Sequence, residues 1–143
     1  MNLVNDAQHR QWLGKPALMR LVKAAMEGHG DDVAVLKYAV SVLLVLAFDE
    51  ASRAELVGMG ILPVVKKIME DHSDSPYVLG QACGLLCNLA SGRGVGRQEV
   101  VAQDMTALVL KAMDAHFEDS RTVECGCSFL RNVSSFYSYQ ATL

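Results

Sequence analysis

The stretch Val78–Ala90, VLGQACGLLCNLA, has a counterpart in Val123–Ser134, VECGCSFLRNVS, which repeats cysteine, leucine and asparagine at matching positions. Asn132 follows Asn88 by 44 residues. A fainter copy precedes them by 43 residues, with matching residues at Ala39, Leu43, Leu46 and Ala47. A sequence period of about 40–47 residues, in which each repeat forms one group of helices, is typical of helical solenoids. The pattern therefore predicts an all-α protein of stacked helices.

A second marker keeps the same spacing. The motif Met-x-x-His occurs once in each unit, at Met26–His29, Met69–His72 and Met113–His116. One arginine per unit follows the same register, at Arg10, Arg53 and Arg97. Two independent markers predict one domain, residues 1–143, with approximate repeats at 5–48, 49–91 and 92–135. Residues 136–143 are predicted to start a fourth unit or to form a terminal segment.

Composition places the chain among globular proteins. Its 143 residues are 51% hydrophobic and 20% charged, with a net charge of −3, so it can bury a core. No concentrated basic patch indicates nucleic acid as a partner. The longest apolar run, Ala39–Phe48, is about half of the roughly 20 residues that span a bilayer, so no membrane insertion is expected. A polar start, MNLVNDAQHR, and the cysteine content favour a reduced, cytoplasmic location.

Each unit is predicted to contain a short, a medium and a long helix. In the first unit these are Asn5–Leu13, Pro16–Glu27 and a helix capped by Asp31 or Asp32 that ends near Phe48. In the second they are a helix capped by Asp49 or Ser52 that ends at Val57, then Ile61–Asp71, and then Tyr77–Ala90 with Ser75 as its cap. In the third they are Arg97–Ala102, Met105–His116 and Thr122–Ser134. Asp or Ser before a helix and proline in its first turn are the usual start signals.

The order of the helices and two segments resemble the armadillo repeat. The segments are Glu55–Val65, with a Gly-Met-Gly corner before the second helix, and Ala82–Ala90, which ends in Asn-Leu-Ala. The resemblance implies a right-handed α-solenoid of about three repeats, and the Met-x-x-His variant is similar to segments of large armadillo scaffolds. The third unit departs from the pattern with Gln103 and Asp104 at the corner, and the first has Val45 in place of the terminal asparagine.

The helical period divides the long helix of the second unit into two stripes. The apolar stripe, expected to face the core, is Val78, Ala82, Leu85, Leu86 and Leu89. The opposite stripe is expected to line a concave groove, and with its equivalents in the other units it comprises Gln81, Gly84, Asn88, Tyr38, Ser41, Val45, Cys125, Ser128 and Asn132. Lys37 and Glu124 lie beside this stripe.

Asn88 and Asn132 are the best-placed candidates for contact with a partner. The armadillo resemblance implies that the terminal asparagine of each third helix hydrogen-bonds the backbone of an extended peptide, and a carboxamide offers suitable donors and an acceptor. The alternative is that each asparagine bonds the last carbonyl groups of its own helix. Nuclear-import armadillo proteins carry a tryptophan four residues earlier, where this chain has Gly84 and Ser128. Basic nuclear-localisation peptides are therefore not the expected ligands.

Three features that suggest chemistry are better explained as core packing, packing or capping at helix ends, and a flexible loop between repeats, respectively. Cys83 and Cys127 are repeat equivalents of Val40, and no close Cys-x-x-Cys pair predicts zinc. The histidines of the Met-x-x-His motif follow the second helices, where imidazole interacts well with a helix C-terminus. The loop Gly92–Arg97 lacks the Gly-Lys-Ser/Thr ending of a phosphate loop. No metal, cofactor or catalytic residue is predicted.

The leading hypothesis is a non-enzymatic module that binds a protein segment along its concave, third-helix surface. The alternative is a scaffold segment or self-assembling subunit that stacks through uncapped ends or continues into further repeats. That alternative rests on the aromatic residues of Phe136–Tyr139, which provide no polar cap. At the other end, Trp12 is expected to cover the first repeat.

Overall fold

The computed structural model describes residues 14–142, with side chains for residues 14–135. This part of the chain is all-α, as predicted, with eight helices and no strand. The predicted helix Asn5–Leu13, with Arg10 and the cap at Trp12, lies outside the described residues. The side chains of Phe136–Tyr139 lie outside them as well.

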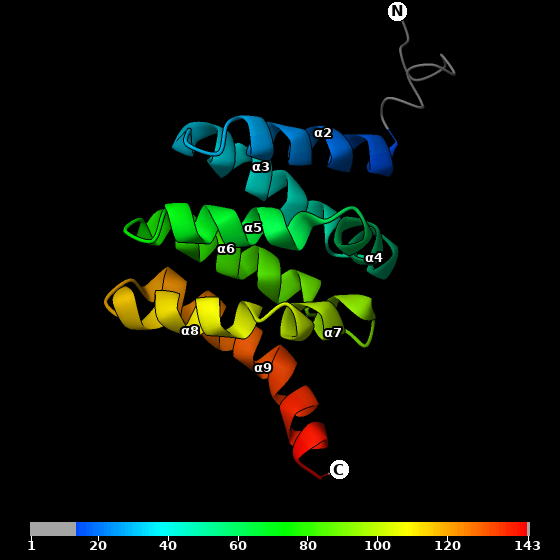
Figure 1. Ribbon diagram of the computed structural model, residues 1–143, viewed down its shortest axis with the longest axis vertical. Helices are drawn as coiled ribbons and strands as arrows, with labels where there is room; N and C mark the ends of the chain where they lie inside the picture. The colour runs from blue at the N-terminus through cyan, green and yellow to red at the C-terminus, as the bar shows by residue number, and fades with distance from the viewer. Residues whose placement is uncertain (1–13, 143) are drawn as a thin grey trace, which may run out of the picture.

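The helices lie in three layers. The first layer is α2 (Lys15–Gly28) and α3 (Val33–Leu46), the second is α4 (Glu50–Gly58), α5 (Ile61–Asp71) and α6 (Pro76–Leu89), and the third is α7 (Val95–Ala102), α8 (Met105–Ala115) and α9 (Ser120–Thr142). Figure 1 shows α2, α5 and α8 one above another toward the viewer, with α3, α6 and α9 behind them. Because α6 packs against α3 on one side and α9 on the other, the long helices form one continuous wall.

Side-chain caps set the starts of the long helices. Asp32 and Ser75 cap α3 and α6 as predicted, by accepting hydrogen bonds from backbone N–H groups two or three residues later. Asp119 does the same for α9 by accepting from the N–H of Thr122 at 2.9 Å. Each cap satisfies N–H groups that have no partner within the helix.

The corner before the second helix has the same backbone conformation in the second and third layers. Gly60 adopts a left-handed conformation with a φ of 85°, and Asp104, 44 residues later, adopts it with a φ of 59°. Glycine takes this conformation without a steric cost, and aspartate is among the few other residues that tolerate it. The third unit therefore keeps the corner although it lacks the glycine.

The core is built around α6. The predicted apolar stripe is confirmed, since Val78, Ala82, Leu85, Leu86 and Leu89 are each at most 4% exposed. The opposite side of the helix is also largely covered, because neighbouring long helices flank it. The second helix of each unit contributes buried methionines to the core: Met19 and Met26 from α2, Met69 from α5 and Met105 from α8.

The start of α7 differs from the prediction. The helix begins at Val95, two residues before the predicted start at Arg97. Gly96 therefore lies inside the helix, where it packs against α6. A Cβ on Gly96 would lie 2.0 Å from the carbonyl O of Leu89, so only glycine permits this approach. The glycine-rich segment is in part a packing element and not only a loop.

The end of α9 also differs from the prediction. The helix continues to Thr142, whereas the sequence pattern predicted an end at Ser134. No glycine or proline interrupts the chain between these two residues. Residues 136–142 therefore extend the long helix of the third layer, and Figure 1 shows its last turns running beyond that layer. Among residues 14–142, no helix is both long and apolar enough to cross a bilayer.

Candidate protein-binding surface

The third-helix wall, formed by α3, α6 and α9, carries a row of polar contacts across all three helices. Gln81 of α6 lies at its centre and is 8% exposed. Its Nε2 donates to Ser41 Oγ of α3 at 3.4 Å and to Tyr77 Oη at 3.4 Å. Arg121 of α9 donates from Nη2 to Gln81 Oε1 at 2.6 Å. A buried amide is stable only when its polar atoms are bonded, and these three contacts satisfy both the nitrogen and the oxygen of the Gln81 side chain.

A second set of contacts joins the long helices near their carboxyl ends. Asn88 Nδ2 donates to the carbonyl O of Leu44 at 3.0 Å, and Asn132 Nδ2 donates to that of Cys87 at 2.9 Å. In each case the acceptor belongs to the long helix of the preceding layer. The alternative in which each asparagine bonds its own helix is therefore wrong. Both asparagines are half-buried, and their role toward a partner stays a prediction.

The histidines of the repeated motif make matching contacts at the other end of the long helices. His72 Nε2 lies 2.7 Å from the carbonyl O of Gly30, and His116 Nε2 lies 2.8 Å from that of Ser73. Because the carbonyl can only accept, Nε2 carries the proton in both rings. The backbone N–H groups of these histidines end α5 and α8. The imidazole rings themselves link successive layers. The sequence predicts only an interaction of each ring with the C-terminus of the helix before it.

The predicted groove residues differ in exposure. Lys37, Tyr38 and Glu124 are exposed, and Lys37 Nζ lies 5.4 Å from the centre of the Tyr38 ring. Ser41 and Ser128 are half-buried. These five side chains lie where a partner can reach them, and their binding role also stays a prediction.

Gly84 is buried between neighbouring helices. A Cβ at this position would lie 3.5 Å from Leu44 Cδ2 of α3 and 3.6 Å from Cys125 Sγ of α9. Both distances are ordinary van der Waals contacts, so an alanine would fit here without moving either helix. Sequence reasoning missed Tyr77 and Arg121, which complete the polar row. The signal that points to them is residue type, because tyrosine and arginine are enriched at protein interfaces.

Three of the four cysteines on the wall, Cys83, Cys87 and Cys125, are poor nucleophiles. Burial raises the pKa of the Cys83 thiol to about 12, with smaller contributions from Cys125 and Cys87. Burial likewise raises the pKa of Cys87 and of Cys125. The thiolate is the reactive and metal-binding form, so these three side chains are protonated at neutral pH. Within the part of the chain that the structure describes, no group of three or more candidate metal ligands occurs.

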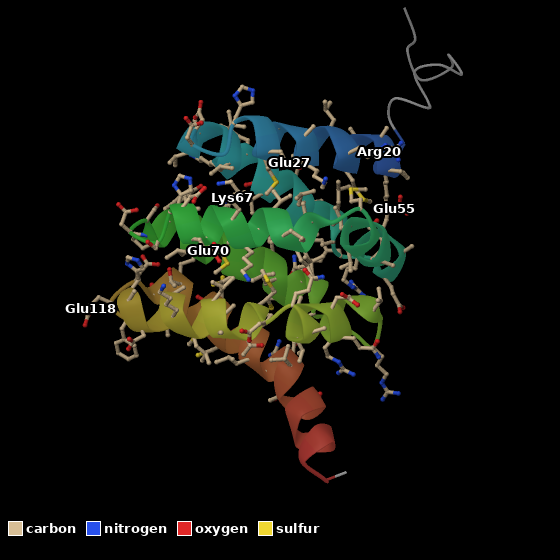
Figure 2. The ribbon with its side chains drawn as sticks, in the orientation of Figure 1. Arg20, Glu27, Glu55, Lys67, Glu70 and Glu118 are labelled. Atoms are coloured by element: carbon tan, nitrogen blue, oxygen red, sulfur yellow. The ribbon has the colours of Figure 1, made fainter. Side chains whose placement is uncertain are left out.

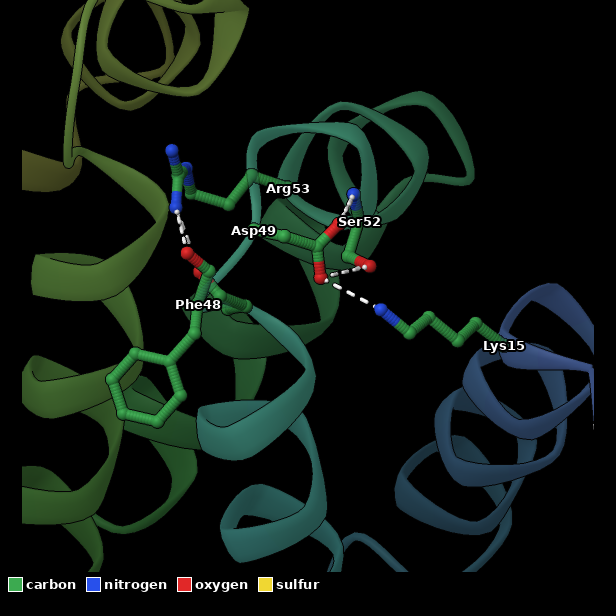
Figure 3. A network of polar contacts seen from close by, with 6 residues as sticks. Lys15, Phe48, Asp49, Ser52 and Arg53 are labelled. Carbon is green, nitrogen blue, oxygen red and sulfur yellow. Dashed lines mark hydrogen bonds and ion pairs between the residues drawn. The ribbon is translucent and has the colours of Figure 1, made fainter.

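A separate network holds the first layer against the second (Figure 3). Lys15 Nζ donates to Asp49 Oδ1 at 3.0 Å, and the same carboxylate caps α4 by accepting from the N–H and hydroxyl of Ser52. The hydrogen bond from Lys15 is the main cause that lowers the pKa of Asp49 to about 2. Arg53 Nη1 donates to the carbonyl O of Phe48 at 2.9 Å. These contacts fix the turn between α3 and α4 and so position the end of the wall.

Comparison of this chain with protein-family models, with curated proteins and with solved structures found no match. Since a fold class does not by itself imply a function, a proposal must come from the arrangement of residues. Among the residues described, the third-helix wall combines a row of polar contacts across three adjacent helices with exposed side chains.

Proposed function

We propose that the chain is an armadillo-type solenoid whose third-helix wall binds an extended segment of a partner protein. The observation that carries the proposal is the row Ser41–Gln81–Arg121, which holds polar groups across three adjacent helices. An extended peptide presents its backbone N–H and C=O groups at regular intervals. Its binding surface must therefore repeat donors and acceptors at intervals, and equivalent helices placed side by side provide that repetition.

Asn88 and Asn132 support the same proposal. Each uses its amide nitrogen to bond the preceding helix, which restricts the side chain to one orientation. The Oδ1 of each asparagine accepts no hydrogen bond from another described residue and is available to a peptide N–H. A side chain that is already ordered loses little entropy when the partner binds. The contact between helices and the contact with a partner are thus compatible.

Exposed charged side chains flank the polar row and favour a partner segment with charges of both signs. Lys37 extends from α3, and Arg121 and Glu124 extend from α9. Complementary charges at the edge of an interface contribute to partner choice and association rate more than to affinity. We expect an acidic residue of the partner near Lys37 or Arg121, and a basic residue near Glu124.

The test compares two double variants that remove the same residue types from opposite sides of the layers. Lys37→Ala/Glu124→Ala removes two exposed charges from the wall. Lys66→Ala/Glu70→Ala removes two exposed charges from α5, a helix that lies on the side of the molecule facing the viewer in Figures 1 and 2. Net charge is unchanged in both. Peptides are selected on the wild-type protein from a displayed library of random sequences, and their affinities are measured by fluorescence anisotropy.

The selected peptides are expected to bind the α5 variant as tightly as the wild type. They should bind the wall variant at least about tenfold more weakly, which corresponds to ~1.4 kcal/mol. Circular dichroism establishes that the three proteins are equally helical. Failure to select any peptide, or equal affinity for the wall variant and the wild type, would contradict the proposal.

A further inference from the structure

Exposed apolar side chains are concentrated on the first layer. Ten large hydrophobic side chains are exposed within residues 14–135, and six of them come from this layer and the turn after it: Leu21, Val33, Tyr38, Val42, Val45 and Phe48. A groove of 450 Å³ between α2 and α3 lies on the outer side of the layer. We define the amino-end face as Leu21, Val22, Val35, Tyr38, Val42 and Val45. Contiguous exposed apolar patches on a folded protein mark interaction sites.

In the second layer, the equivalent positions are buried against the first. The residues that follow Val22, Val35 and Val42 by 43 positions are Val65, Val78 and Leu85. They are at most 4% exposed, and α5 and α6 carry them against α2 and α3. The amino-end face therefore corresponds to the surface that this fold buries between layers. No side chain described in residues 14–135 covers it, and Trp12, which the sequence predicts to cover the first repeat, lies outside the described residues.

A further layer in the same order does not suit this face. Asn88 and Asn132 reach back to a carbonyl group of the layer before them, whereas Val45 occupies that position in the first layer and has no side-chain donor. In the third layer, Glu124 and Arg131 are exposed. They follow by 44 residues Gly80 and Cys87, which face the next layer, α9, and so they correspond to the outer side of the third layer. Docking that end on an apolar face would remove both charges from water without a partner, which is unfavourable.

We propose that the amino-end face binds the same face of a second copy of this chain and forms a two-fold symmetric dimer. Such a contact places apolar side chains against apolar side chains on both sides. It is also closed, because each copy uses its single amino-end face once, so assembly stops at two. The dimer does not depend on peptide binding, and Tyr38 and Val45 belong both to the amino-end face and to the stripe predicted to line the groove.

The experiment measures the mass in solution by analytical ultracentrifugation of three proteins over roughly 1 µM to 1 mM, the range that covers weak and moderate dimers. They are the wild type, Leu21→Lys/Val45→Lys on the amino-end face, and Leu110→Lys/Phe117→Lys on the third layer. The replaced side chains are 62% and 66% exposed in the first double variant and 50% and 71% exposed in the second. Both variants add the same charge and remove comparable apolar surface.

The wild type and the third-layer variant are expected to pass from monomer to dimer with similar dissociation constants. The amino-end variant should have a dissociation constant at least tenfold higher. A wild type that stays monomeric throughout, or masses that grow beyond the dimer, would overturn the proposal. Equal weakening in both double variants would instead indicate a head-to-tail contact. Because Leu21→Lys/Val45→Lys alters two helices, circular dichroism checks its helicity, and Val45→Lys alone provides the second variant if the double is not folded.

Discussion

Asn132 of α9 donates a hydrogen bond of 2.9 Å to the backbone carbonyl of Cys87 in α6. Asn88 makes the equivalent bond from α6 to Leu44 in α3. The asparagines that we propose as partner contacts therefore join neighbouring layers. A change at either asparagine alters stability as well as any surface for a partner, so exposed residues such as Lys37 and Glu124 are better probes of binding.

Asn132→Ala is expected to lower the free energy of unfolding by about 1 kcal/mol, the usual contribution of one hydrogen bond. Asn132→Asp should cost more, because a carboxylate oxygen would then face the carbonyl of Cys87 without a hydrogen between them. Ser134→Ala is the control, since its hydroxyl is exposed and bonds within α9. Urea unfolding at constant m-value measures all three. An Asn132→Ala midpoint equal to that of Ser134→Ala would show that the bond contributes nothing.

Gly96→Ala should destabilise the protein strongly. The added Cβ would lie 2.0 Å from the carbonyl O of Leu89, so α7 must move away from α6, at a cost of about 3 kcal/mol or more. Gly58→Ala is the matched control, because a Cβ there meets nothing within 4 Å. Within a helix it should stabilise by up to about 1 kcal/mol. Thermal and urea unfolding measure both, and similar stabilities for the two variants would contradict the predicted contact.

Thiol reactivity should follow burial. Cys127 is exposed, and Cys83 is buried with a pKa of about 12. In the native protein at mildly alkaline pH, a maleimide should modify Cys127 first and Cys83 last, because only the thiolate reacts. Mass spectrometry of timed samples identifies the order. The fast phase should disappear in Cys127→Ser, and all four thiols should react together in urea. Early modification of Cys83 would contradict its burial.

Acid should weaken the contact between the first two layers. The pKa of Asp49 is lowered from 3.8 to about 2 by its bonds to Lys15 and Ser52. Because the folded-state pKa is the lower one, the stabilisation is fully present above pH 3.8 and is lost as the pH falls toward 2. In Asp49→Asn, the urea midpoint should change less with pH across this window. Asp114→Asn, at an exposed carboxyl on α8, is the control. An unchanged slope in Asp49→Asn would rule out this contribution.

Much of the fold could be predicted because its signals are local. The caps Asp32 and Ser75 act on N–H groups within three residues. The helix Ile61–Asp71 was predicted with the bounds it has in the structure. Errors arose where a local signal was weak or ambiguous. Gly96 resembles a loop residue until its contact with Leu89 is known, and no breaker marks the helix that continues past Ser134.

The candidate site could be predicted only in outline. The helical period placed Lys37, Tyr38 and Glu124 on one side of their helices, where they are exposed. It could not distinguish these from Gly84 and Gln81, which lie on the same stripe but are buried between neighbouring helices. Burial at those positions depends on what stands on either side of α6, and that is not a property of α6 itself.

Local sequence predicts most of the helices and the apolar stripe of α6, because residues three and four apart share a helix face wherever the helix lies. Which groups meet between layers follows only from how the helices pack. Gly30 and His72, or Leu44 and Asn88, are joined across more than forty residues of chain. Such contacts depend on the angle and spacing at which one layer packs on the next, and these are set by side-chain packing over the whole interface.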